Sequence, residues 1–339
     1  MNTIVIQTAL TLEQQSVIDR LSNVCDYVHP VSKTIYKVGN YFSSGNKLQI
    51  FIGRTNQTNI NAAIETERII QHFNPSYIFF VGVAGGLKDV VIGDIVIGSD
   101  VIGYERGKEK DVFYPRPQFG ISSYELEQHA VSFSISDEWR KQASSIVNEK
   151  FQNNIQVHSG TIASGEKVVS SIDSKLYNFL KTNCSHALAV ETEGLGFLEA
   201  CRAYPLIKTL IIRGISDLVD GKEHADQEGS QPYASKNATE FLFGLIDYIK
   251  IKQGFIILTK RQKLSEITTK LYPTGIKENG IWERAGGDLS LVHLNSTGKA
   301  QWIEALRLVE NGGGGDIDFD SIIREIKIDY ANNESLKTF

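Results

Sequence analysis

Cysteine, positive charge and long apolar runs are all scarce in this chain of 339 residues. Its three cysteines show no CxxC spacing and leave one unpaired, so we expect neither a disulfide framework nor a zinc site, and a reducing cytoplasm fits best. With 35 Lys and Arg against 40 Asp and Glu, the net charge of -5 gives the chain no bulk attraction to nucleic acid. We also expect no cofactor.

The longest apolar stretch, Tyr77–Leu87, is far shorter than the ~20 residues that cross a bilayer. The N-terminal letters MNTIVIQTAL lack a basic segment and a small-residue cleavage site, which indicates a first strand and not a signal peptide. The sequence has no internal repeat and no low-complexity tract. These absences predict a soluble protein without membrane contact.

Short β-branched runs alternate with amphipathic helical patterns up to about residue 250. Continuous apolar runs are typical of strands buried on both faces, so residues 1–250 are predicted to form an α/β domain with a mainly parallel or mixed twisted sheet flanked by helices. Ligands bind such sheets at the carboxyl ends of the strands. The predicted strands are TIVIQTAL, LQIFIG, YIFFVGVA, DIVIGSDVIG, LAVETEG and TLIIRGISD, and the clearest helix is NAAIETERIIQHF.

After Lys250 the pattern becomes one of short helices alone. We predict a brief linker at 250–259 and a small all-α bundle at 258–339, with Ser296 or Thr297 capping its third helix and the glycines at 312–315 ending that helix. The four helical segments are RQKLSEITTKLY, GIWERAGG, GKAQWIEALRLVENG and DFDSIIREIKIDY. The candidate core consists of Leu264, Trp282, Trp302, Leu306, Ile322 and Ile326.

Three carboxylates stand where predicted strands end: Glu13, Glu193 and Asp217. Each has a plain structural alternative, since Glu13 could be a favourable acid in a first helical turn and Asp217 an N-cap. As a set they also suit cleavage of an N-glycosidic bond, in which one acid protonates the leaving base and another carboxylate activates water on the opposite face of the sugar. The pattern by itself leaves both interpretations open.

Two loops carry further candidate binding residues. The motif VGVAGGL (81–87) fails the dinucleotide GxGxxG spacing, so it either lets backbone approach a flat ligand or is a turn that needs small residues. The loop at 103–118 carries Arg106, Lys108, Lys110 and Arg116. It is either a solvated charged loop or a cationic lip for the phosphates of a nucleotide.

In chain order, ALTLEQQSV, VGVAGGLKDVVIGDIVIG, SGTIASGEKVV, AVETEGLGF and IRGISDLVDGK resemble the sequence blocks of the purine nucleoside phosphorylase superfamily. The likeness covers about residues 3–250 and is greatest to the nucleosidase branch, which includes methylthioadenosine/S-adenosylhomocysteine nucleosidase. It implies a hydrolase that releases a purine base, adenine in the first instance, from a nucleoside or nucleotide. It also implies a homodimer or larger assembly.

Carried over by motif, the resemblance implies that Asp217 protonates purine N7, that Glu13 positions the attacking water and that Glu193 holds the ribose 2′- and 3′-hydroxyls. Ser216 would support Asp217. The remaining residues that the resemblance places around the base and sugar are Ala84, Gly85, Val168 and Val169.

Three departures from the family pattern affect this site. Thr192 stands where the family has a methionine before the ribose-binding glutamate, and Val168 replaces an aromatic residue that stacks on the base. Val83 stands where phosphorylases carry a phosphate-binding hydroxyl residue, which favours water as the nucleophile. The alternatives are a phosphate-dependent phosphorylase and a catalytically silent nucleotide sensor, although a sensor would not need Asp217.

The C-terminal segment, with its GGDLS, GKAQW and GGGG landmarks, resembles a small effector-associated domain, a death-like module fused to enzymes in bacterial conflict systems. This resemblance implies an adaptor that pairs with a similar domain on a protein partner, in defence against phage. The alternative is a helical appendage that stabilises or dimerises the enzyme.

Overall fold

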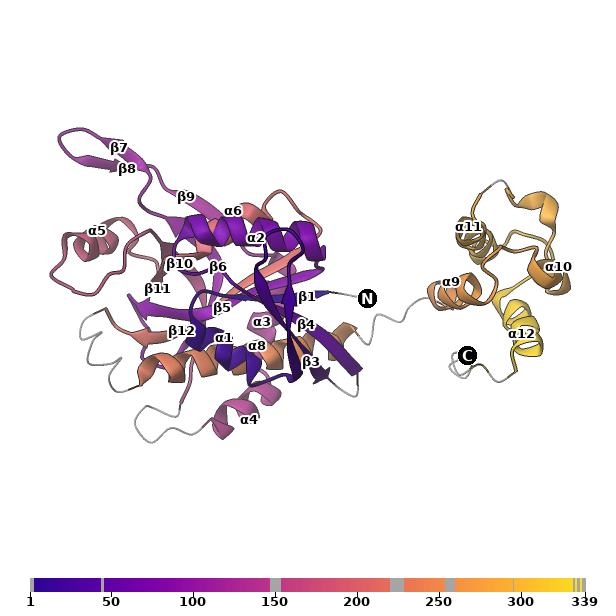
Figure 1. Cartoon of the computed structure of the whole chain (residues 1–339), viewed down its shortest axis with the longest axis horizontal. Helices are drawn as coiled ribbons and strands as arrows, with labels where there is room; N and C mark the ends of the chain where they lie inside the picture. Colours follow the sequence, from indigo (N-terminus) through magenta and orange to yellow (C-terminus); the bar gives the residue numbers. More distant parts are fainter. Residues whose placement is uncertain are drawn as a thin grey trace. The chain divides into compact units, whose positions relative to one another are not determined.

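The chain divides into two compact units, Met1–Ile251 and Lys252–Phe339, in the computed structural model drawn in Figure 1. The structure describes residues 3–43, 46–146, 154–219, 229–253, 260–294, 296–331, 333 and 336. Within these residues no helix is long and apolar enough to cross a membrane. The predicted linker at 250–259 begins inside a helix that continues to Gln253, and its residues 254–259 lie outside the described part.

The first unit is built on a ten-stranded mixed sheet with the order β11-β10-β6-β12-β5-β1-β4-β3-β2, in which β9 pairs with β6. Its strands are β1 (Ile4–Thr8), β2 (Ser22–Val28), β3 (Ile35–Ser43), β4 (Asn46–Arg54), β5 (Tyr77–Gly86), β6 (Ile95–Gly103), β9 (Gln118–Ile121), β10 (Val157–Ser164), β11 (Ala189–Glu191) and β12 (Lys208–Asp217). The predicted α/β class with a mixed sheet is confirmed.

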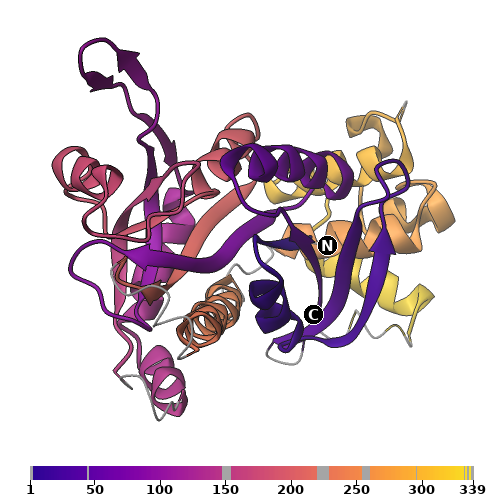
Figure 2. The same ribbon diagram turned by 60° about the vertical axis from the view of Figure 1, so that its left-hand side comes forward.

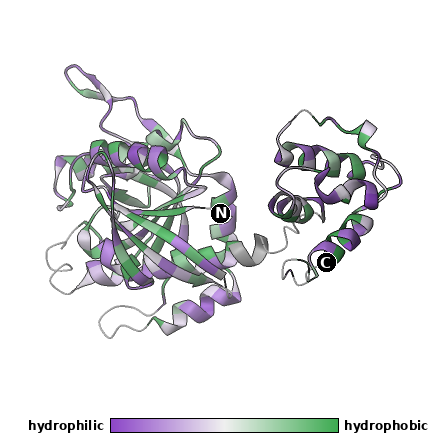
Figure 3. Cartoon of the chain, turned by 45° about the vertical axis from the view of Figure 1, so that its right-hand side comes forward, coloured by the Kyte–Doolittle hydropathy of each residue, from purple (hydrophilic) through white to green (hydrophobic). Residues whose placement is uncertain are grey.

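Helices cover both faces of this sheet because the buried strands alternate their apolar side chains between two cores. Ile4 and Ile6 of β1 pack with helices α1, α3, α4 and α8, whereas Val5 packs with α2 and α6 on the other face. Figure 3 shows the strands as the most hydrophobic part of the unit. The helices are α1 (Thr11–Ile18), α2 (Asn59–Phe73), α3 (Tyr124–Ser134), α4 (Asp137–Ser145), α5 (Lys175–Asn183), α6 (Gly194–Cys201) and α8 (Ser230–Gln253).

Strand direction determines where the functional residues meet. β1, β4, β5 and β12 run parallel to one another, and β11 is antiparallel to β5 through the pairs Ala189–Gly86 and Val190–Gly85. This pairing closes the path from β11 to β5 into a ring and brings the end of β11 against the end of β5. The glycine motif predicted at 81–87 therefore lies at a junction of strand ends.

A short hairpin of β7 (Gly107–Glu109) and β8 (Phe113–Pro115) projects from the body of the first unit (Figure 2). It carries the cationic loop singled out in the sequence. The side chains of Arg106, Lys108 and Arg116 are all exposed.

The second unit is a small helical bundle with its own core, as the helical patterns predict. The two tryptophans Trp282 and Trp302 are fully buried in it, and the other four predicted core residues belong to the same cluster. Thr297 caps α11 by accepting a bond from Ala300 N at 3.4 Å, and Gly312 beyond its end takes a positive φ of 78°. The helices are α9 (Lys260–Leu271), α10 (Ile281–Arg284), α11 (Gly298–Glu310) and α12 (Phe319–Asp329), with short 3₁₀ turns at Glu278–Gly280 and Leu289–Leu291.

Candidate active site

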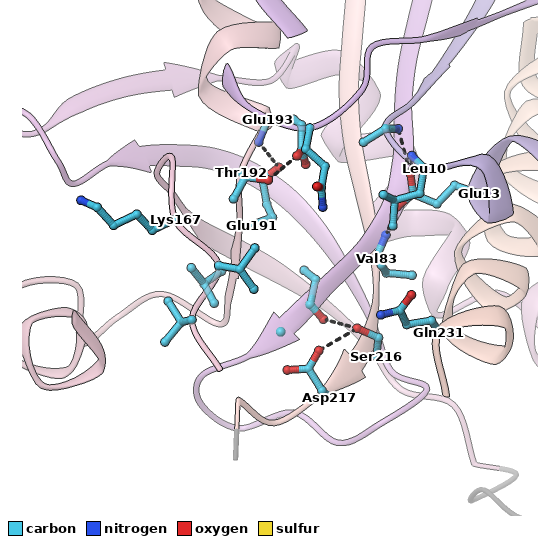
Figure 4. Close-up of a pocket in the computed structure, with 17 residues that line it drawn as sticks. Leu10, Glu13, Val83, Lys167, Glu191, Thr192, Glu193, Ser216, Asp217 and Gln231 are labelled. Carbon is cyan, nitrogen blue, oxygen red and sulfur yellow. Dashed lines mark hydrogen bonds between the residues drawn. The ribbon is translucent and has the colours of Figure 1, made fainter. Parts of the chain in front are cut away.

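One pocket of the first unit collects the three acids that the sequence singles out. Glu13, Glu193 and Asp217 reach it from α1, from the end of β11 and from the end of β12, and Figure 4 shows them around one space. The other residues that line the pocket are Ala9, Leu10, Gln57, Val83, Ala84, Gly85, Lys167, Val168, Val169, Val190, Glu191, Thr192, Ser216 and Gln231. Every residue predicted for catalysis or for binding the base and sugar is therefore part of this wall.

Glu13 is a buried carboxylate held by backbone donors. Its Oε2 accepts bonds from Ala9 N and Leu10 N, and its Oε1 accepts one from Val83 N, each at 2.8 Å. A carboxylate has about four lone-pair sites, so one is left to accept a proton from water. Burial raises the pKa of Glu13, while the positive charge of Arg213 and the backbone bonds oppose that rise. The group is thus a first-turn helix acid that also lines the pocket.

Arg213 supplies the positive charge behind the pocket. Its side chain is buried within β12, its Nη2 donates to Glu191 Oε2 at 2.9 Å, and its guanidinium lies 4.3 Å from the ring centre of Phe80. A Cβ on Gly82 would lie 2.4 Å from Glu13 Oε1 and 2.9 Å from Arg213 Nη1. Only glycine therefore allows the Glu13 carboxylate and the Arg213 guanidinium to approach the same point of β5.

Glu191 links that charge to the helix that follows Glu193. It accepts bonds from Glu193 N at 3.0 Å and Gly194 N at 2.8 Å, where the helix dipole of α6 favours a negative charge. The E-x-E pair is therefore divided by role. Both carboxylates line the pocket, but Glu191 also binds the guanidinium and the N–H groups at the start of α6.

The Glu193 carboxylate has an unusually high proton affinity. Burial and then the neighbouring charge of Glu191 raise its pKa to about 7, against the opposing effect of Arg213. Its Oε1 accepts bonds from the Thr192 hydroxyl and from Thr58 N, the latter at 3.2 Å. Thr192, where the family has methionine, is thus a hydrogen-bond partner of the glutamate.

Asp217 closes β12 and is buried at the far side of the pocket. Ser216 Oγ donates to its Oδ2 at 2.9 Å, and Val219 N donates to its Oδ1 at 3.0 Å. Gly85 lies against the same carboxylate, because a Cβ there would be 3.1 Å from Asp217 Oδ1. Ser216 therefore contacts Asp217 as the resemblance implies.

Aliphatic side chains form the rest of the wall. Val169 is buried, Val168 is largely exposed, and no aromatic residue is among the described residues that line the pocket. A flat base would therefore lie against valines and the Ala84–Gly85 backbone. No group of three or more His, Cys, Asp or Glu side chains in the described ranges could hold a metal ion.

The three cations predicted to bind phosphate do not line this pocket. Arg106, Lys108 and Arg116 belong to the projecting β7–β8 hairpin and its flanks, which the local sequence could not reveal. A different cation, Lys167, lines the wall instead, and its side chain extends away from the three acids (Figure 4). It donates to Glu105 at 2.8 Å.

Sequence reasoning missed several residues of the site. Arg213 had a usable signal, since a lone charge inside the apolar strand TLIIRGISD needs a buried partner. Gln57, Lys167 and Gln231 had none, because they come from loops and a helix start that only the fold brings together.

Buried acids that converge on one pocket at strand ends have the chemistry that an N-glycosyl hydrolase requires. Comparison with known proteins agrees with this class. Residues 3–247 match the Phosphorylase superfamily. The chain therefore belongs to the Phosphorylase superfamily, and it is nucleosidase-like within it.

Two of the curated relatives are named nucleosidases. The 5′-methylthioadenosine/S-adenosylhomocysteine nucleosidase of Staphylococcus haemolyticus (strain JCSC1435) is 27% identical over 202 residues, which cover 59% of this chain and 82% of the relative. The ATP nucleosidase Cap17 of Escherichia coli (strain KTE188) is 30% identical over 177 residues, covering 48% of this chain and only 34% of that protein.

Solved structures share the fold of the first unit. The 5′-methylthioadenosine/S-adenosylhomocysteine nucleosidase from Neisseria meningitidis, in complex with methylthio-immucillin-A, gives a TM-score of 0.57 at 20% identity and covers 73% of this chain and 99% of that one. Futalosine hydrolase of Helicobacter pylori strain 26695 gives 0.58 at 20% identity, with 73% and 97% covered.

Proposed function

We propose that the first unit hydrolyses the N-glycosidic bond of a purine nucleoside or nucleotide, with adenine as the base, and releases it by attack of water at C1′. The observation that carries the proposal is the convergence of Glu13, Glu193 and Asp217 on one pocket. The names of the relatives, which include nucleosidases of methylthioadenosine and of ATP, support the substrate class.

In the proposed mechanism the base lies against Val168, Val169, Ala84 and Gly85. Asp217 donates a proton to purine N7, so that the electrons of the C1′–N9 bond leave with a neutral base. Ser216 Oγ, 2.9 Å from Asp217 Oδ2, holds the carboxyl in the orientation for this transfer. General acids of this kind contribute roughly 10²–10⁴-fold to a rate.

Water attacks the opposite face of the sugar. Glu13 takes the proton from this water with its remaining lone pair, and the positive charge of Arg213 opposes the rise in the pKa of Glu13 that burial causes. Glu193 accepts bonds from the ribose 2′- and 3′-hydroxyls, and its negative charge stabilises the positive charge that develops on the sugar. The reaction consumes one water and yields free base and a reducing sugar.

The test is chromatography after incubation of the purified protein with adenosine, methylthioadenosine, AMP and ATP, with and without inorganic phosphate. We expect free adenine in amounts that do not depend on phosphate. A ribose 1-phosphate product would identify a phosphorylase, and binding without any product would identify a sensor.

A matched pair of variants tests the acid. Asp217→Asn should lower turnover by roughly 10²-fold or more while substrate still binds, because an amide cannot supply the proton. Asp100→Asn is the control, since Asp100 is likewise an aspartate that accepts two hydrogen bonds, from the hydroxyls of Ser99 and Thr161, but it does not line the pocket. Near-normal turnover of Asp217→Asn would remove Asp217 from the mechanism.

For the second unit we propose an adaptor of the effector-associated type, at residues 258–339, which recruits the enzyme to a partner with a similar domain in an antiphage system. Its support is the sequence resemblance together with an apolar core that belongs to this unit alone. Light scattering of the full chain tests the accompanying proposal of a homodimer or larger assembly.

A further inference from the structure

The loop between β4 and α2 adopts a backbone conformation that its residue types disfavour. Thr58, the N-cap of α2, has φ 92° and ψ 146°, a region used almost only by glycine, and Asn56 before it has φ 61°. A β-branched residue there is a clear outlier, which persists only where surrounding contacts hold it. Contacts to other segments must therefore stabilise this strained turn.

The backbone of Thr58 contacts the candidate ribose-binding residue directly. Thr58 N donates to Glu193 Oε1 at 3.2 Å, across 135 positions of the sequence. Backbone strain at this position thus coincides with a contact to Glu193.

The next residue, Asn59, joins three segments with one side chain. Its Oδ1 accepts bonds from Gly196 N at 2.8 Å and Ser164 Oγ at 3.0 Å, and its Nδ2 donates to Gly165 O at 3.2 Å. Gly196 lies in the first turn of α6, directly after Glu193, and Gly165 begins the segment 165–169 that ends in the valine wall. The side-chain amide of Asn59 makes all three of these hydrogen bonds.

The backbones of α2 and α6 also approach closely at this point. A Cβ on Gly196 would lie only 1.9 Å from Asn59 O, so no other residue fits there without moving one of the two helices. Asn59 itself does not line the pocket, which separates it from residues that would touch substrate.

We propose that Asn59 is a positioning residue for the hydrolase: it locks the start of α2 to α6 and to segment 165–169, so that Glu193 and the base wall keep their places around the substrate. This inference rests on the proposed function, because it takes Glu193 as the residue that binds the ribose hydroxyls. Its loss should therefore reduce the benefit that a 2′-hydroxyl brings to the reaction.

The experiment compares kcat/KM for adenosine with 2′-deoxyadenosine, and for ATP with 2′-deoxy-ATP, at pH 8. In Asn59→Ala, we expect the preference for the ribose substrate to fall by roughly 10-fold or more, since an ångström of misplacement can cost on the order of 10²-fold in rate. A merely destabilising change would reduce the active fraction equally for both sugars and leave the ratio unchanged.

Three further variants make the result decisive. Asn59→Asp keeps the acceptor for Gly196 N and Ser164 Oγ, so it should retain most of the ribose preference. Asn59→Ser, whose shorter side chain cannot bridge α6 and segment 165–169, should lose the preference and replaces Asn59→Ala if that protein does not fold. Asn237→Ala is the matched control, because Asn237 is a buried asparagine that donates to Gly93 O at 2.8 Å away from the pocket wall. It should lower the melting temperature without changing the ratio.

The outcomes separate this inference from the proposed function. Absence of base release by the wild-type protein from every substrate would refute the function itself. A wild-type enzyme that prefers ribose, with the same preference in Asn59→Ala, would overturn only the positioning role. A wild-type enzyme indifferent to the 2′-hydroxyl would remove Glu193 from the ribose site and this inference with it.

Discussion

Replacement of Arg213 by methionine should show that the pocket is held together by charge. The change keeps an unbranched side chain but removes a positive charge that opposes the raised pKa values of both Glu13 and Glu193. Arg213 and Glu191 are each almost fully buried, with side chains 1% and 2% exposed. Removal of one partner from a buried pair typically costs about 3–5 kcal/mol.

The loss should depend steeply on pH. Without the guanidinium, Glu13 and Glu193 take up protons more readily in the folded state, while the unfolded carboxyls stay ionised above about pH 5. The folded state then binds more protons between pH 5 and 8, so its stability falls as pH rises. For each pH unit over which the folded state binds one additional proton, the free energy of unfolding changes by about 1.36 kcal/mol. Between pH 8 and pH 5 this change would recover most of the stability that Arg213→Met loses.

Differential scanning calorimetry of the full chain at pH 8 and pH 5 is the assay. At pH 8 we expect the transition of the first unit to fall by roughly 6–20 °C, from about 2–4 °C per kcal/mol for a unit of this size. The transition of the second unit is the internal reference. The double variant Arg213→Met with Glu191→Gln should recover much of the loss, because it leaves one buried charge fewer unpaired. Equal losses at both pH values, or no recovery in the double variant, would refute the electrostatic argument.

Three further predictions concern the pocket, the hairpin and the second unit. Because the pKa of Glu193 is about 7, kcat/KM for ribonucleosides should rise through pH 7 as it ionises, and Glu193→Gln should lose that limb of the profile. The raised pKa stabilises the fold at low pH, and this contribution is lost as pH rises from 4.5 through 7, so unfolding measurements should show the same slope vanish in Glu193→Gln. If the hairpin cations bind phosphate, Lys108→Glu with Arg116→Glu should impair ATP turnover far more than adenosine turnover, and equal effects would leave a solvated loop. Deletion of residues 258–339 should leave basal base release intact but abolish co-purification of a partner, and an insoluble truncated protein would favour a structural appendage.

Long apolar runs made most of the first unit predictable. The strands TIVIQTAL, LQIFIG, YIFFVGVA, DIVIGSDVIG and TLIIRGISD correspond to β1, β4, β5, β6 and β12. Strands buried on both faces carry apolar residues without interruption, so their signal is local. The hairpin of β2 and β3 went unpredicted because β2 is an exposed edge strand whose side chains show no buried face.

Motif order identified the acids but not what surrounds them. Glu13, Glu193 and Asp217 could be selected because each follows a recognisable strand and stands in a family-like block. The prediction that the cations at 103–118 bind the phosphates of a substrate stays untested. Arg106, Lys108 and Arg116 belong to a hairpin and its flanks that project from the body of the first unit, and none of them lines the pocket. The position of a loop depends on the direction in which the chain leaves the sheet, and the amino-acid composition of the loop does not predict this direction.

The sequence by itself determined the α/β class, the helical second unit and the three acids, because hydrophobic period, capping residues and short motifs act over neighbouring positions. Only the tertiary structure decided that Arg213 faces Glu191, that Thr58 and Asn59 contact the surroundings of Glu193, and that Lys167 lines the pocket. These contacts join residues from 22 to 137 positions apart. Their energies depend on burial and on distances of about 3 Å, which exist only once the strands have paired and the helices have packed.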